Sequence, residues 1–161
     1  MFSKNDMPIA TLNPVSIDLL RAWDRMERKP EGWTQADAER ALRRYERFLV
    51  LVAAHPGKSQ APTRDIDEMW HLHMLSPKAY YDDCMRTFGD ILDHDGGFGK
   101  GEDEATRLRT TFEQTARMWQ EMCGEAYVTA DGQQSTKCWH NCVSRCWHAC
   151  ASKPGKIQTD A

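Results

Sequence analysis

Residues 34–57, TQADAERALRRYERFLVLVAAHPG, decide the fold class. Apolar side chains recur here every three or four residues, which is the spacing of one face of an α-helix, at Ala38, Ala41, Leu42, Tyr45, Phe48, Leu49 and Val52. Thr34, followed by Asp37, begins the helix as a weaker relative of the capping box. The His-Pro-Gly sequence at 55–57 ends it. We therefore predict one long amphipathic helix here.

Further helices are expected on both sides of this one. Ser16 is the predicted cap of a first helix, because apolar residues from Leu19 to Met26 fall on one face. Thr63 is the predicted cap of a helix over 64–75. The next helix begins at Ser-Pro, 76–77, and ends at Gly89, and a last one spans roughly 102–123.

No segment alternates between apolar and polar residues as a strand does, so the predicted class is all-α. We expect a compact bundle of about five helices in one domain, residues 1–128. A polar linker, 129–136, follows it. Residues 137–161 form a tail rich in Cys, Trp and His, with a short Cys-rich helix.

The composition excludes several functional classes. A net charge of −3 gives no basic patch for nucleic acid. No apolar run approaches the ~18 residues of a membrane span, and the N-terminal sequence lacks the apolar core of a signal peptide. We therefore expect a cytoplasmic protein that binds neither nucleic acid nor membrane. In that reducing compartment, six cysteines indicate metal binding or redox chemistry rather than a disulfide framework.

The stretch DIDEMWHLHML, 65–75, carries two histidines inside a predicted helix. At 100° per residue, with Ile66 at zero, His73 falls at about 340°, in the middle of the apolar stripe. His71 falls at about 140°, at its border. Asp67 lies one turn before His71 and can accept a hydrogen bond from its ring, as a carboxylate in the second shell of a metal does.

Other soft or borderline ligands flank this helix. Cys84 falls near the centre of the apolar stripe of the next helix, His55 ends the helix before, and His94 follows in a loop. The candidate set for zinc or another late transition metal is therefore His55, His71, His73, Cys84 and His94. The alternative is a polar structural cluster, in which a buried histidine bonds a backbone carbonyl and the cysteine acts as a small hydrophobe.

Residues 55–95 also carry a recognisable string, W-H-x-H-x-L, then Pro, Tyr, Asp-Cys, Phe-Gly and His. In this sequence those places are held by Trp70, His71, His73, Leu75, Pro77, Tyr80, Asp83, Cys84, Phe88, Gly89 and His94. Over roughly residues 34–125 the chain resembles bacterial members of the glycine-rich-domain-protein-like family. After His94 it departs from the family's usual HHFPYFG. The resemblance implies a helical domain whose His and Cys positions form one unit, and it implies no settled activity.

The tail, KCWHNCVSRCWHAC at 137–150, has a different pattern. Its cysteines recur every four residues, so on a helix they form one face about 120° wide, at Cys138, Cys142, Cys146 and Cys150. The outer two lie about 18 Å apart along such a helix, too far for one ion. Neighbouring pairs suit Cu(I), or half of a zinc site that links two chains. A metal-free docking helix is the alternative.

We therefore expect a metal-binding or thiol-buffering helical protein, with zinc or Cu(I) as the ion and a metal-linked dimer or a protein partner through the tail. One alternative is an interaction or scaffold domain whose His/Cys cluster is purely structural. Another is a metal-dependent enzyme with an open site of His71, Asp67 and a second histidine. A last one is a recognition module whose tail is a modification substrate. An enzyme is less favoured, because the sequence has no nucleophile–base pair, phosphate loop or HExxH motif.

Overall fold

The computed structural model describes residues 13–94 and 101–128, and within these ranges all regular secondary structure is helical. The five helices are α1 (Leu19–Asp24), α2 (Gln35–Ala54), α3 (Arg64–Met74), α4 (Pro77–Phe88) and α5 (Glu102–Cys123). The all-α prediction is confirmed. The predicted linker 129–136 and tail 137–161 lie outside the described residues. None of the helices in the described ranges is long and apolar enough to cross a membrane.

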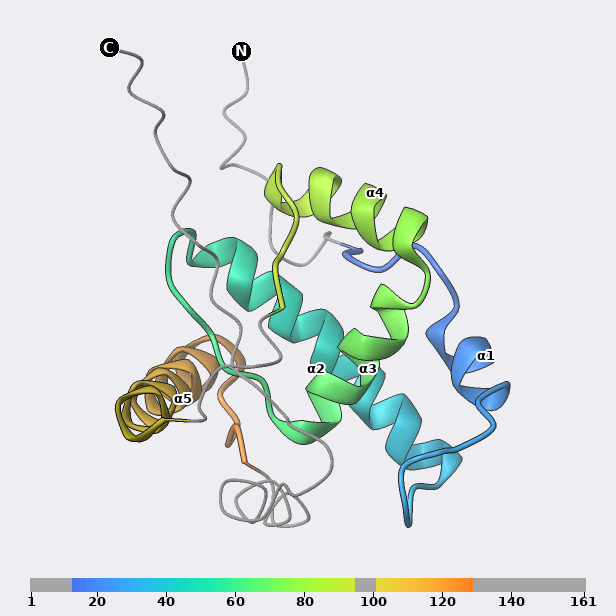
Figure 1. The fold of residues 1–161 in the computed structure, drawn as a ribbon, viewed down its shortest axis with the longest axis horizontal. Helices are drawn as coiled ribbons and strands as arrows, with labels where there is room; N and C mark the ends of the chain where they lie inside the picture. The colour runs from blue at the N-terminus through green and yellow to red at the C-terminus, as the bar shows by residue number, and fades with distance from the viewer. Residues whose placement is uncertain (1–12, 95–100, 129–161) are drawn as a thin grey trace.

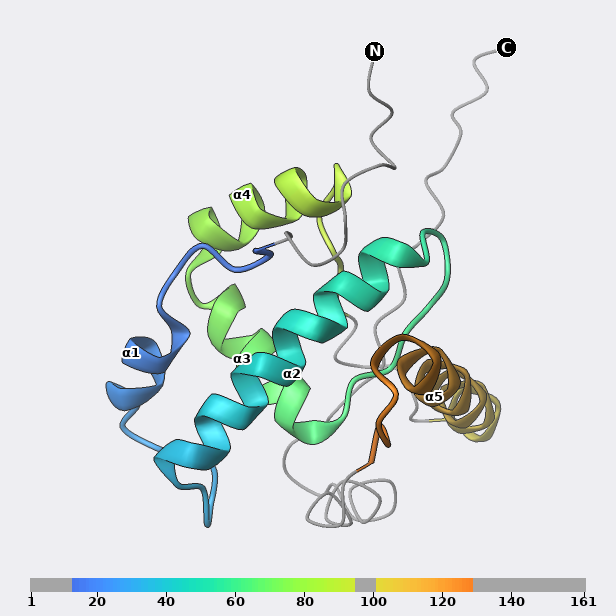
Figure 2. The same ribbon diagram turned by 180° about the vertical axis from the view of Figure 1, so that it is seen from behind.

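Helix α2 is the central element. Figures 1 and 2 show it running through the molecule, with α3 crossing it and α5 lying beside its C-terminal half. Its buried face includes Ala41, Tyr45, Phe48 and Leu49, which are among the residues whose periodicity predicted the helix. The core lies where α1, α3 and α5 pack against that face.

The predicted capping residues are right for α2 and wrong for α1. The Thr34 hydroxyl accepts from the Asp37 N–H at 3.3 Å, and the Asp37 carboxylate accepts from the Thr34 N–H at 2.8 Å, completing a capping box. Helix α1 is capped by Asp18 rather than Ser16. The N–H of Ser16 instead donates to Asp83 Oδ2 at 2.7 Å, so the segment before α1 is held against α4.

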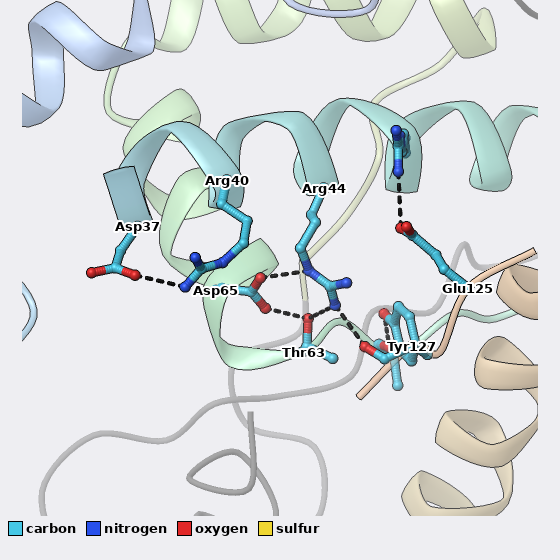
Figure 3. Close-up of polar contacts among 9 residues, drawn as sticks. Asp37, Arg40, Arg44, Thr63, Asp65, Glu125 and Tyr127 are labelled. Carbon is cyan, nitrogen blue, oxygen red and sulfur yellow. Dashed lines mark hydrogen bonds and ion pairs between the residues drawn. The ribbon is translucent and has the colours of Figure 1, made fainter. Parts of the chain in front are cut away.

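A buried arginine connects α2, α3 and the segment after α5. Arg44 donates from Nε to Asp65 Oδ2 at 2.6 Å and from a terminal nitrogen to the Tyr127 carbonyl at 2.6 Å (Figure 3). Its guanidinium also lies 5.1 Å from the centre of the Trp119 ring. Thr63, at the N-cap of α3, bonds Asp65 and Arg44 through its hydroxyl and makes no capping bond.

The turn after α4 positions the site described next. Gly89 has a φ of 78°, in the left-handed region that glycine adopts without steric strain because it has no Cβ. This conformation ends α4. The chain then returns toward α3, where Leu92 is buried in the core. His94 follows two residues later, at the end of this described range.

Candidate metal site

Three side chains from two parts of the chain meet beside α3. Asp67 and His71 lie one turn apart on that helix, and His94 comes from the segment after α4. Each offers one ligand atom such that all three atoms lie within 4.8 Å of one another. Among the described residues, no other group of three or more His, Cys, Asp or Glu side chains has ligand atoms close enough together to hold one metal ion.

Asp67 is the centre of this group. Its side chain is 1% exposed, and its Oδ1 accepts a hydrogen bond from His94 Nε2 at 2.8 Å. Its second oxygen, Oδ2, lies 3.7 Å from His71 Nδ1 and has no hydrogen-bond donor within the described ranges. A buried carboxylate oxygen without a donor costs free energy, so this atom is available for a cation.

The two histidine rings lie parallel. Their centres are 4.6 Å apart with an interplanar angle of 5°. The His94 side chain is 4% exposed and also packs against Trp70, whose ring centre lies 4.8 Å away. The His71 side chain is 41% exposed, so the group opens to solvent on that side.

The distances suit an ion. Ligand atoms that hold a tetrahedral ion with bonds of about 2.0–2.1 Å lie about 3.3 Å apart. The two separations measured from Asp67, 2.8 Å to His94 and 3.7 Å to His71, lie on either side of this value. Parallel rings do not aim their lone pairs at one point, so an ion also requires one ring to turn. The His71 side chain is 41% exposed, so it is the ring that would turn.

The structure places His73 in a separate, fully bonded cluster. Its Nδ1 lies 2.9 Å from the Tyr45 hydroxyl and its Nε2 lies 3.1 Å from Asp83 Oδ2. Burial lowers the pKa of His73, although the Asp83 carboxylate acts in the opposite direction. A neutral ring therefore accepts from Tyr45 and donates to Asp83, and neither nitrogen is left for a metal.

Cys84 and His55 also lie apart from the Asp67 group. Burial raises the pKa of the Cys84 thiol, and this disfavours the thiolate that a metal needs. His55 bonds the Leu51 carbonyl through Nδ1 at 2.9 Å. It lines a cavity of about 400 Å³ together with residues from the end of α4 and the segment after it. The candidate ligands Cys138, Cys142, Cys146 and Cys150 lie outside the described residues.

Sequence reasoning placed His71 at the border of α3 and Asp67 one turn before it, as the structure does. It gave Asp67 as a second-shell carboxylate and, in the enzyme alternative, as part of an open site with His71 and a second histidine. It did not identify Tyr45 and Asp83 as the partners of His73. The i,i+4 spacing was the available signal for Asp67. For Tyr45, 28 residues before His73, there was no local signal.

Comparison with known proteins agrees with the resemblance seen in the sequence. Residues 30–83 match the glycine-rich domain-containing protein-like family. That range includes Asp67, His71 and the Tyr45–His73–Asp83 cluster, and it ends before His94. The family match therefore covers two of the three residues of the candidate site.

Two plant proteins are similar to the chain. Glycine-rich domain-containing protein 1 of Arabidopsis thaliana is 35% identical over 99 residues, and glycine-rich domain-containing protein 2 of the same plant is 32% identical over 96 residues. Each match covers 57% of this chain and 12% of the relative, so the chain spans a small part of the length of these relatives. No solved structure matches the chain.

Proposed function

We propose that this protein binds a divalent late transition metal through Asp67, His71 and His94. The observation that carries the proposal is the buried Asp67 carboxylate. One of its oxygens bonds His94, and the other has no hydrogen-bond donor among the described residues. The imidazoles of His71 and His94 both lie at ligand distance from it. An ion would take the place of the proton that His94 and Asp67 share, and water would fill the remaining positions.

The donor set favours particular ions. Two imidazoles and one carboxylate suit Zn(II), Fe(II) and similar divalent ions, whereas Cu(I) prefers thiolates. A soft ion is therefore proposed for the tail cysteines, and a borderline divalent ion for the Asp67 site. We also propose, from the W-H-x-H-x-L string, that the chain belongs to the bacterial members of the matched family, in the cytoplasm.

One feature favours a second function, that of a metal-dependent enzyme. Two histidines and one carboxylate with open positions form the ligand set of non-haem Fe(II) oxygenases. The exposed side of His71 would leave room for water or a substrate at those positions. Fe(II) binding followed by O₂-dependent loss of a candidate substrate would distinguish this function from simple binding.

The test requires a chain in which the tail cannot compete. In the full chain with all four tail cysteines replaced by serine, we expect one equivalent of Zn(II) to be retained against a chelator of micromolar affinity. His94→Ala and Asp67→Asn should each abolish this retention. Zinc content is measured by elemental analysis after dialysis.

His55→Ala is the matched control. His55 lies at the end of α2, bonds the Leu51 carbonyl and is not part of the Asp67 group. It should leave the zinc content unchanged. If the background chain binds no zinc, or if His55→Ala loses it as His94→Ala does, the metal site is refuted. The Asp67–His94 pair is then a structural hydrogen bond of an interaction domain.

A further inference from the structure

His94 reaches Asp67 from the short segment that follows α4. Few residues of that segment are available to fix the position of His94. Between Gly89 and His94, only Leu92 is buried. The position of His94 therefore depends on what holds Leu92, two residues earlier. His94 follows Leu92 by only two residues, so fixing the Leu92 backbone limits where the His94 ring can lie.

The Tyr80 hydroxyl bonds the backbone of Leu92. It donates a hydrogen bond to the Leu92 carbonyl, and it accepts one from the Trp70 indole N–H at 2.9 Å. Tyr80 and Leu92 are both buried, so water does not compete for either hydrogen bond. One hydroxyl thus joins α3, α4 and the segment that carries His94.

Trp70 supplies the second half of the arrangement. Its indole ring is fixed at Nε1 by Tyr80 and lies 4.8 Å from the ring centre of His94. It is also the residue directly before His71 on α3. The same hydroxyl therefore fixes both the backbone that carries His94 and the aromatic surface on which the His94 ring rests.

We propose that Tyr80 is the positioning residue of the Asp67–His71–His94 site. Its hydroxyl holds the His94 ring in the orientation that presents Nε2 to Asp67, without touching the ion. This inference rests on the proposed metal binding for its functional consequence. The positioning itself is a property of the metal-free protein and can be measured there.

Tyr80→Phe is the decisive variant, because it removes one oxygen and keeps the ring. It leaves the Trp70 N–H and the Leu92 carbonyl without their partner, and the segment that carries His94 is released. In the background without tail cysteines, we expect the dissociation constant for Zn(II) to rise about 10- to 100-fold, as when outer partners of metal ligands are removed.

Tyr45→Phe is the matched control. It also removes one hydroxyl from a buried tyrosine bonded to an aromatic partner, but that partner is His73 rather than the Trp70–Leu92 pair. Both variants should lower the thermal midpoint, whereas Tyr45→Phe should change zinc affinity less than twofold. Equal losses of affinity in the two variants would show a general effect of destabilisation and overturn the proposal.

The metal-free protein gives an independent readout. In the wild type, ¹⁵N NMR of the imidazoles should show His94 as a single tautomer with the proton on Nε2, bonded to Asp67. In Tyr80→Phe it should show the mixture of tautomers typical of a free imidazole. Trp70→Phe, which keeps an aromatic ring but removes the donor to Tyr80, should shift His94 in the same direction.

The two proposals fail in different ways. If the wild type binds no zinc but the His94 tautomer changes in Tyr80→Phe, the metal function is refuted and the positioning role stands. If the wild type binds zinc, and Tyr80→Phe changes neither affinity nor tautomer, the positioning role is refuted alone.

Discussion

His73 and Asp83 form a buried pair between α3 and α4, with Nε2 and Oδ2 3.1 Å apart and the side chains 1% and 2% exposed. The same Asp83 oxygen accepts the backbone N–H of Ser16, and the other oxygen pairs with Arg86 at 2.7 Å. Burial raises the pKa of Asp83, but the bonds from Ser16 and Arg86 outweigh it and the net pKa is lowered. One carboxylate therefore stabilises two helices and the segment before α1.

His73→Ala should destabilise the protein much more than His71→Ala. The first leaves a cavity and deprives Tyr45 and Asp83 of a buried partner, which costs about 2–4 kcal/mol. The second removes a half-exposed ring and costs about 1 kcal/mol or less. Urea unfolding with a chelator present gives both values. A larger loss for His71→Ala would contradict the burial described for the two rings.

Arg44→Met should also be strongly destabilising. It leaves Asp65 and the Tyr127 carbonyl without their common donor, and we expect a loss of about 2–4 kcal/mol. Arg47→Met, one turn later on α2, is the matched control, because its partner Glu125 and Arg47 itself are about half exposed. That change should cost about 1 kcal/mol or less. Denaturant midpoints that fall equally would argue against the connecting role of Arg44.

The tail should be dispensable for folding, whereas Tyr127 should not be. A chain ending at Ala130 should keep the thermal midpoint of the full chain, because the helices already bury their apolar faces among themselves. Tyr127→Ala should cost about 3–5 kcal/mol, since that ring is buried and its hydroxyl bonds the Ala61 carbonyl at 2.8 Å. Thermal unfolding followed by circular dichroism compares the three chains. Loss of cooperative unfolding in the truncated chain would refute the domain boundary.

Glu46→Gln should increase stability at neutral pH more than at pH 4. Burial raises the pKa of Glu46, against the opposing effect of Arg43. Because its folded pKa exceeds the unfolded value, the folded state binds more protons between the two values, and the ionised carboxylate destabilises it above them. Glutamine removes that cost and changes little where the acid is already protonated. Unfolding free energies of both chains from pH 3.5 to 7 test this, and an advantage that does not grow with pH would contradict it.

The tail should bind at least two equivalents of Cu(I) per chain under anaerobic conditions, because the four-residue spacing of its cysteines predicts that neighbouring thiols would pair along one face of a helix. Replacing Cys138 and Cys142 by serine should remove one equivalent and leave the pair Cys146 and Cys150 working. Competition against a Cu(I) chelator measures both numbers. Complete loss of binding in the double variant would show a single shared centre instead.

Much of the fold was present in local sequence. The apolar periodicity of α2, the Thr34–Asp37 box and Gly89 after α4 each act within a few residues, so the helices and most of their ends follow from the sequence alone. Ser16 was wrong as the cap of α1, because the Asp18 carboxylate accepts the Arg21 N–H there. The contact that Ser16 makes instead, with Asp83 67 residues later, has no local signal.

In the candidate site, too, some features follow from local sequence and others only from tertiary packing. The sequence determined that His73 points inward, that His71 lies at a border and that Asp67 is its neighbour, since helix geometry fixes side chains one turn apart. Only the tertiary structure decided that His94 joins Asp67 while Tyr45 and Asp83 take both nitrogens of His73. Those pairings depend on how α2, α3 and α4 pack and on the return of the chain after Gly89. Packing brings together side chains that no periodicity relates, and buried polar atoms then bond whichever partners lie within reach.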